Sequence, residues 1–256
     1  MTGRVLTRRQ MLLRSSAALG GLLLGGCDRL SESPSFRRLL DGGESLSYHS
    51  QRLLVGRQAL AREFSRSDLS PVFRSNGTSS PDTPEYNELL VDEFRQWRLK
   101  IDGLVMRPLE LSLDHLRLMP ARTQITRHDC VEGWSAIGQW TGVPLSALLK
   151  LAGLLPVARY IVFYCADTFD TETDAYYESI DLIDAFHPQT ILAYELNGKP
   201  LPVANGAPLR LRVERQLGYK HAKYVMRIEA VQHLGHIGGG KGGFWEDRGY
   251  EWYAGV

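Results

Sequence analysis

Recurrent strand patterns, with few helical patterns between them, constrain the fold of this chain more than any other feature. Segments in which apolar and polar residues alternate, or in which apolar residues run almost without interruption, are typical of β-strands. They occur at residues 97–103, 123–127, 159–167, 191–202, 209–214 and 224–232. Because helices do not alternate regularly with these strands, the pattern predicts a mixed α+β fold with more strand than helix.

Local signals predict a hairpin and three short helices. Asn197 and Gly198, inside the segment 191–202, favour a tight turn between two strands. Helices are expected after Ser112, Thr141 and Ser179, each of which is a good N-cap residue followed by a helical apolar pattern.

Length and composition indicate an ordinary globular protein. The chain has 256 residues, of which 43% are hydrophobic and 23% charged, enough to bury the core of one domain or at most two small ones. Thirty Lys and Arg against 29 Asp and Glu give a formal net charge of +1. So balanced a charge provides no global field that would attract nucleic acid, and we expect no nucleic-acid partner.

Residues 1–27 have the anatomy of a bacterial export signal. A basic start containing Arg8 and Arg9 precedes a short apolar run that is too short to span a bilayer, and small residues lead to Cys27. The arginine pair favours the twin-arginine route, and "LGGC" resembles the lipobox in which the cysteine is acylated. Asp28 after that cysteine favours the inner membrane. We therefore expect a periplasmic protein anchored by a lipid on Cys27, with plain cleavage near Gly26 as the alternative.

The rest of the chain is expected to form two parts. Residues 28–70 are predicted to be a tether and an N-terminal wrap, with one amphipathic helix at 51–64. Residues 71–256 are predicted to form the folded catalytic domain, and a cluster of turn residues at 75–87 predicts a loop at its start.

Two cysteines remain after the signal, Cys130 and Cys165. In an oxidising compartment they are candidates for a disulfide. The sequence has no Cys-x-x-Cys, no His-Glu-x-x-His and no Asp-rich calcium loop, so zinc and calcium sites find no support. Its glycine-rich segments do not follow a strand and open a helix, which excludes a dinucleotide fingerprint.

The segment "HDCVEGWSAIGQWTGVPLSALL", with the later runs "GAPLRLRVERQLGYKHAKYV" and "GFWEDRGYEWY", resembles the molybdopterin-binding domain of the sulfite oxidase family. The resemblance covers residues 70–256. It implies that Cys130 is the sole protein ligand of a molybdenum ion carried by one pyranopterin dithiolene. A soft thiolate suits such a metal, and the dithiolene supplies two further sulfurs.

The resemblance also implies a set of residues that hold the pterin. They are Asn76, Cys165, Asn205, Arg210, Gly218, Tyr219 and Lys220. Arginine and lysine suit a buried phosphate because charge-assisted hydrogen bonds compensate its lost hydration. Beside the metal, His128 is a candidate proton relay and Arg127 a candidate contact to a substrate oxyanion.

The predicted reaction is two-electron oxygen-atom transfer to or from a small oxo compound of sulfur, nitrogen or carbon. The chain contains no haem-binding segment and ends where sulfite oxidases continue into a dimerisation domain. It therefore resembles the single-domain periplasmic branch that includes methionine-sulfoxide reductases, whose electrons pass through a separate cytochrome. Two alternatives stay open: a hydrolase using Cys130 and His128, and a non-catalytic tethered module with a Cys130–Cys165 disulfide.

Overall fold

The computed structural model describes residues 33–169 and 175–256, which belong to two compact units, residues 1–55 and 56–256. The predicted signal at 1–27 lies outside the described residues. The described part of the first unit is the helix α2 (Pro34–Leu54), which has a proline in its first turn. In the described ranges, no helix has the length and apolar character needed to cross a membrane.

The predicted helix at 51–64 is wrong. Helix α2 ends at Leu54, and residues 61–64 instead run along the second unit, where the Phe64 N–H donates to the carbonyl of Ile125 at 2.9 Å. Glu63 and Thr126 form an isolated antiparallel bridge beside this contact. Pairing with an exposed strand edge satisfies these backbone groups better than a further helical turn.

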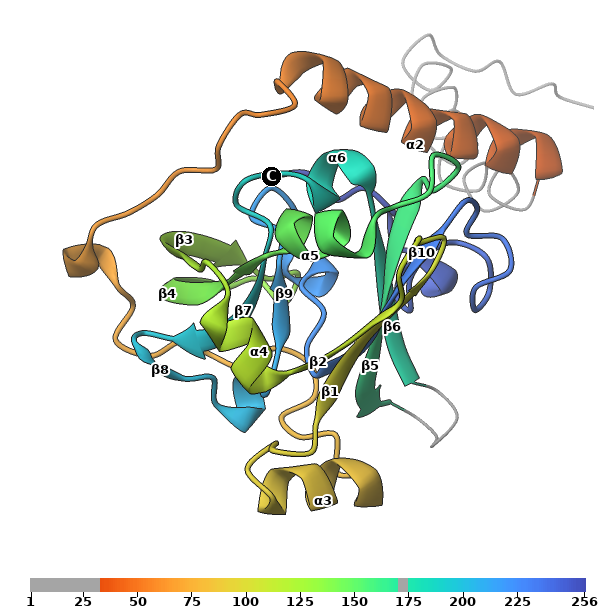
Figure 1. Cartoon of the computed structure of the whole chain (residues 1–256). Coiled ribbons are helices and arrows are strands. Elements are labelled where there is room, and N and C mark those ends of the chain that lie inside the picture. The colour runs from red at the N-terminus through yellow and green to blue at the C-terminus, as the bar shows by residue number, and fades with distance from the viewer. Residues whose placement is uncertain (1–32, 170–174) are drawn as a thin grey trace, which may run out of the picture. The chain divides into compact units, whose positions relative to one another are not determined.

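The second unit is built on two five-stranded sheets (Figure 1). The first sheet contains, in spatial order, β2 (Leu109–Ser112), β1 (Arg98–Gly103), β10 (Val225–Val231), β5 (Tyr160–Thr168) and β6 (Ala175–Asp181). Only the β1–β10 pair of this sheet is parallel. Both faces of β5 are buried, because Ile161 and Phe163 belong to one apolar cluster and Val162 to another, and this explains its nearly continuous apolar sequence.

The second sheet is antiparallel throughout. It contains β3 (Arg122–Asp129), β4 (Ser135–Pro144), β7 (Ile191–Leu196) and β8 (Lys199–Pro200) in that order, and β9 (Arg210–Arg212) also pairs with β7. The β7–β8 hairpin turns at Asn197 and Gly198, both with positive φ, as the sequence predicts. The mixed α+β prediction is confirmed.

Four short α-helices accompany the sheets. They are α3 (Pro84–Val91), α4 (Leu113–Leu118), α5 (Leu145–Ala152) and α6 (Leu182–Ala185). Fully buried side chains from β1, β5, α5 and β9, among them Leu99, Phe163, Leu148 and Leu211, belong to one apolar core. This continuous core fixes the strand ends that carry the candidate site.

Three helix boundaries differ from the predictions, whereas Ser112 does cap α4. Thr141 lies in β4, because Gly142 lets this strand approach β7 closely: a Cβ on Gly142 would lie 2.1 Å from the carbonyl oxygen of Leu192. Ser179 lies in β6, and Asp181 caps α6 instead. Within the predicted loop 75–87, α3 begins after the Thr83 cap.

Candidate functional site

The candidate site is a cavity beside the turn that joins β3 to β4. Cys130 follows the last residue of β3, and its N–H donates to the carbonyl of Trp134 at 2.9 Å, closing a turn that Gly133 completes with a positive φ. The cavity encloses about 690 Å³ of empty space, its open mouth included, and Cys130 forms part of its wall. Cys130 therefore faces an open space that polar and aromatic side chains also line.

Cys130 is 9% exposed. Burial raises its pKa, and the nearby Glu132 carboxylate raises it further, against hydrogen bonds from backbone N–H groups and the charge of Arg210. A bound metal ion would reverse this balance, since coordination deprotonates a thiol. Cys130 is therefore suited to bind a metal and poorly suited to act as a free nucleophile.

Asn76, Asn205 and Arg210 lie together beside the same cavity. Asn76 lines it and accepts a hydrogen bond from Nη2 of Arg210 at 2.9 Å, while Nη1 of Arg210 donates to the carbonyl of Asn205 at 3.1 Å. Burial, and then the charge of Arg212, lower the pKa of Arg210 to about 9. Within the described residues, Nε of Arg210 and Nδ2 of Asn205 have no hydrogen-bond partner, although both atoms are buried. These two residues lie behind Asn76 and are not themselves part of the cavity wall. Unpartnered buried donors of this kind suit an anionic ligand.

Lys223 is the cation that lines the cavity itself, in addition to Arg210 behind Asn76. Its Nζ donates to the carbonyls of Thr78 and Ala204. Burial, and then the charge of Arg210, lower its pKa to about 7. A phosphate placed beside Lys223 would favour its charged form, so anion binding here is coupled to proton uptake.

Asp167, at the end of β5, faces the same cavity. Its Oδ2 accepts a hydrogen bond from Thr78 Oγ1 at 2.6 Å, and its Oδ1 has no partner within the described residues. Burial raises its pKa to about 6. Cys165 lies two residues earlier on the same strand but does not line the cavity, so its predicted contact to the pterin has no support in this arrangement. Burial, and then Asp167, raise the pKa of its thiol well above the ordinary value.

His128 is buried behind the turn and does not line the cavity. Nη1 of Arg212 lies 3.0 Å from its Nδ1, and Arg212 forms a bidentate ion pair with Glu214. Because an arginine only donates, Nδ1 must accept, which leaves the proton of a neutral ring on Nε2. Burial, and then the charges of Arg210 and His221, lower the pKa of His128 well below the ordinary value.

Gly218 packs against this histidine. A Cβ on Gly218 would lie 2.5 Å from Nε2 of His128 and 2.7 Å from Cε1. The neighbouring Tyr219 lines the cavity. The segment "GYK" is therefore at the site, although only its tyrosine faces the open space.

Lys220 has a different environment from the one the resemblance implies. It is completely buried, it is ion-paired with both Glu178 and Glu246, and it is not part of the cavity wall. Two carboxylates already compensate its charge. The lysine that faces the cavity is Lys223, three residues later.

Arg127 points away from the site. Side chains of a strand alternate between its two faces, and Arg127 lies on the exposed face of β3 while Thr126 and His128 are buried. Its Nε donates to Oδ2 of Asp129 at 2.9 Å. The predicted contact between Arg127 and a substrate oxyanion therefore has no support in this arrangement.

The two thiols support neither alternative, the tethered module with a disulfide or the thiol hydrolase. Cys130 and Cys165 are both free, so the disulfide of the first alternative is not formed. The thiol hydrolase requires a thiolate beside a base, whereas the pKa of Cys130 is raised and Nδ1 of His128 accepts from Arg212.

Three residues that the sequence interpretation missed also face the cavity: Asp167, His221 and Lys223. His221 and Lys223 lie just beyond "GYK" in "KHAKY", where alternation would have placed them on one side. Nε2 of His221 lies 3.0 Å from the carbonyl of Gln216, and its Nδ1 has no partner within the described residues. A neutral His221 therefore presents Nδ1 as an acceptor.

Aromatic side chains form another part of the wall. Phe169, which follows β5, and Tyr176 in β6 contribute to it, and the C-terminal segment contributes Trp245 and Tyr250. The rings of Trp245 and Tyr250 are stacked with centroids 5.4 Å apart. The cavity thus combines a cationic, polar region with an aromatic one.

The residues present fit a molybdenum–pterin group. Within the described ranges, no three His, Cys, Asp or Glu side chains gather as a protein-only metal site. The cavity wall contains one thiol, the cation Lys223 and the unpartnered atoms Oδ1 of Asp167 and Nδ1 of His221, and Arg210 reaches the wall through Asn76. This set matches a metal whose other ligands belong to an anionic organic group.

Comparison with known proteins gives consistent matches. The family described as "Oxidoreductase molybdopterin binding domain" matches residues 86–235, more than half of the chain. The chain is 38% identical to the "Putative protein-methionine-sulfoxide reductase subunit YedZ1" of Azospira oryzae, over 98% of this chain and 88% of that protein. It is 37% identical to the "Protein-methionine-sulfoxide reductase catalytic subunit MsrP" of Xanthomonas campestris, over 63% of this chain and 52% of that protein.

Among solved structures, the sulfane dehydrogenase SoxCD from Paracoccus pantotrophus matches with a TM-score of 0.48 and 24% identity. The match covers 54% of this chain and 39% of that one.

Proposed function

Because this chain belongs to the oxidoreductase family with a molybdopterin-binding domain, we propose that its cavity holds a molybdenum–pterin cofactor through Cys130. The chain is a molybdenum-dependent oxidoreductase. The observation that carries the proposal is the position of one buried thiol on a cavity wall that also contains unpartnered polar atoms.

The substrate is a sulfoxide, and oxidised methionine is its best candidate. Two relatives are named as protein-methionine-sulfoxide reductase subunits. The aromatic wall offers favourable contacts to a sulfur-containing side chain. When bound, the molybdenum centre would supply two-electron oxygen-atom transfer chemistry; overall, the sulfoxide, two electrons and two protons give a thioether and one water molecule.

The residues of the chain bind the cofactor and keep it oriented. Cys130 binds the metal as a thiolate, and Asn76, Arg210 and Lys223 hold the anionic end of the pterin. Nδ1 of His221, an acceptor without a partner in the described residues, would be available to bind the pterin. Asn205 supports the site through its contact to Arg210, and Tyr219 closes the wall.

Asp167 is the group on the cavity wall that can hold a proton for the reaction, because burial raises its pKa to about 6. His128 keeps a proton on Nε2 and orients the turn that carries Cys130. Sulfoxide reduction consumes protons, so a group that titrates near neutrality suits it.

Location and electron supply complete the proposal. The signal features at residues 1–27 support export by the twin-arginine route and a lipid on Cys27 that anchors the enzyme at the periplasmic face of the inner membrane. A separate membrane or soluble cytochrome supplies the electrons. An acyl group on Cys27, detected by mass spectrometry of the membrane fraction, tests the anchor.

A metal and activity measurement on matched variants tests the site. The full chain, Cys130→Ser and Cys165→Ala are produced in a host that makes the cofactor. Molybdenum content is then measured together with methionine-sulfoxide reduction by a reduced viologen. We expect one molybdenum per chain in the wild type and in Cys165→Ala, and none that is stably bound in Cys130→Ser. A Cys130→Ser protein with full metal content and turnover would refute the proposal.

A further inference from the structure

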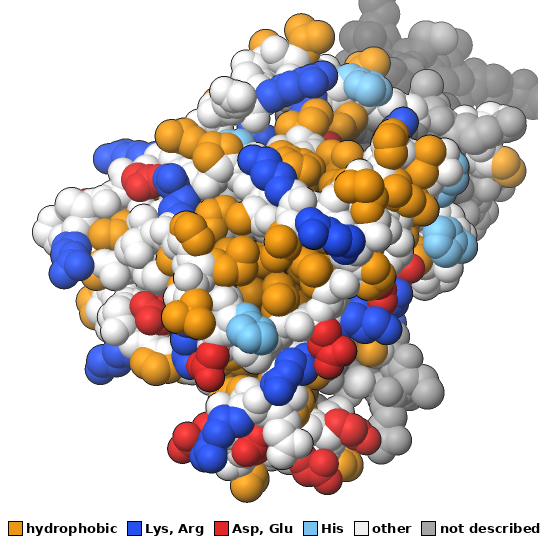
Figure 2. Space-filling view, in the orientation of Figure 1, with side chains coloured by type: hydrophobic (Ala, Val, Ile, Leu, Met, Phe, Trp, Pro, Cys, Tyr) orange, Lys and Arg blue, Asp and Glu red, His pale blue; other side chains and the backbone are white. Residues whose placement is uncertain are grey.

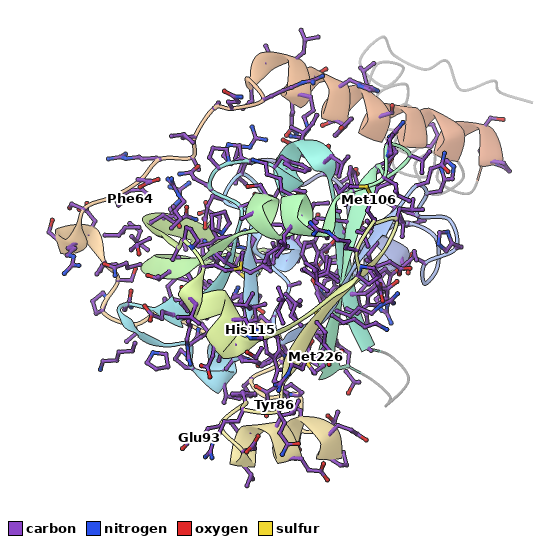
Figure 3. All side chains as sticks on the ribbon, viewed as in Figure 1. Phe64, Tyr86, Glu93, Met106, His115 and Met226 are labelled. Atoms are coloured by element: carbon purple, nitrogen blue, oxygen red, sulfur yellow. The ribbon has the colours of Figure 1, made fainter. Side chains whose placement is uncertain are left out.

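Two neighbouring loops of the second unit form an exposed apolar surface. The Met106 N–H donates to the carbonyl of Gly153 at 2.8 Å, and the Leu155 N–H donates to the carbonyl of Leu104 at 2.9 Å, so the loop after β1 and the loop after α5 are joined. Met106, on the loop after β1, is 68% exposed, and Val157, on the loop after α5, is 45% exposed. Leu151, at the end of α5, is 39% exposed. We call this surface the Met106 face (Figure 3).

Three exposed cations accompany these apolar side chains. They are Arg107 on the loop after β1, Lys150 on α5 and Arg159 on the loop after α5. Segments 104–109 and 147–159 contain no acidic residue. Within the described part of the chain none of the three cations forms an ion pair, although Arg107 and Arg159 donate to backbone carbonyls of these loops. Figure 2 shows apolar and basic side chains next to one another over this part of the molecule.

This combination matches one partner chemistry. Apolar side chains beside lysine and arginine are favoured at the surface of an anionic bilayer, where the apolar groups enter the headgroup region and the cations meet lipid phosphates. The centres of protein–protein interfaces, by contrast, are depleted of charged residues, whereas three exposed cations lie among the apolar side chains of the Met106 face. We propose that the Met106 face docks the folded domain on an anionic lipid surface.

The proposal does not depend on the cofactor site or on the lipid at Cys27. It predicts that the second unit lies against the membrane with α5 and the loop after β1 nearest the lipid. Docking of this kind fixes the orientation of an enzyme that a tether alone would leave free to rotate.

Vesicle binding of matched variants of the full chain tests the inference. The face variant is Met106→Asp/Lys150→Glu. The control is Val91→Asp/Lys199→Glu, which makes the same chemical changes at exposed positions on α3 and β8. Binding is measured by co-sedimentation with vesicles of phosphatidylglycerol and phosphatidylcholine and with vesicles of phosphatidylcholine alone, at low and high salt. All variants share the same N-terminus, so differences between them report the face.

We expect the wild type and the control to bind anionic vesicles, and the face variant to bind at least tenfold more weakly. Reversal of one charge near an anionic surface alone accounts for roughly a 30-fold loss. Lys150→Glu alone, a surface change that does not disturb the fold, shows most of that loss, and high salt weakens the wild type. Equal binding of the face variant and the control to anionic vesicles overturns the inference and would leave a protein partner as the occupant.

Discussion

Replacement of Lys220 by methionine tests whether the buried cluster of Lys220, Glu178 and Glu246 stabilises the fold. Each of these side chains is at most 1% exposed, and the ammonium group is paired with both carboxylates. Lys220→Met leaves two adjacent carboxyls in the core without a counter-charge. Removal of one partner from a buried ion pair costs about 3–5 kcal/mol. For a domain of this size that loss lowers Tm by roughly 6–20 °C.

The loss should also depend on pH. Burial, and then the charge of Glu246, raise the pKa of Glu178 well above its ordinary value. The folded protein therefore keeps a proton that the unfolded chain releases above the ordinary carboxyl pKa, and this contribution to stability falls as pH rises towards the folded pKa. Without Lys220 the carboxyls hold protons more strongly still. Lys220→Met should therefore be more destabilised relative to wild type at pH 8 than at pH 5.

Urea unfolding followed by circular dichroism at pH 5 and pH 8 measures the effect. The double variant Lys220→Met/Glu246→Gln removes one of the uncompensated carboxylates and should recover a large part of the lost stability at pH 8. A loss of less than about 1 kcal/mol, or the same loss at both pH values, would show that the cluster does not stabilise the fold as argued.

Two further predictions concern the cavity. Gly218→Ala forces a methyl group against His128 and should destabilise the protein by about 1–3 kcal/mol. Gly235→Ala places its methyl group in open space and should change the free energy of unfolding little. Urea unfolding of both variants measures the difference. The lowered pKa of Lys223, about 7, means that the unfolded chain binds a proton that the folded one releases, so this group makes the stability of cofactor-free protein rise between about pH 7 and pH 10. Lys223→Met should remove that rise and also weaken molybdenum retention, and a variant that keeps the rise would contradict the assignment.

The fold class followed from local sequence patterns, and the location of the site followed from the resemblance to a known family. Alternating segments predicted the mixed fold, and the Asn197–Gly198 pair predicted the hairpin, because turn geometry and strand burial are encoded within a few residues. Cys130 was identified from its neighbours "HDCVEGW", and the structure places it on the wall of a cavity.

Element boundaries and the partners of charged residues were decided by tertiary contacts. Thr141 was predicted to cap a helix, but pairing with β7 keeps it in a strand, and such pairing joins residues more than 50 positions apart. Lys220 and Lys223 look equivalent in "GYKHAKY". Only the tertiary structure shows that two glutamates from distant segments neutralise Lys220 while Lys223 faces the cavity.

The sequence by itself determined which chemistry the chain contains: one thiol in a distinctive context, cations to meet an anion, and strands to hold them. The tertiary structure decided which of these groups face the same empty space. The physical reason is that the charge state of a buried group depends on desolvation and on neighbours brought from distant parts of the chain, and neither is visible in a local pattern.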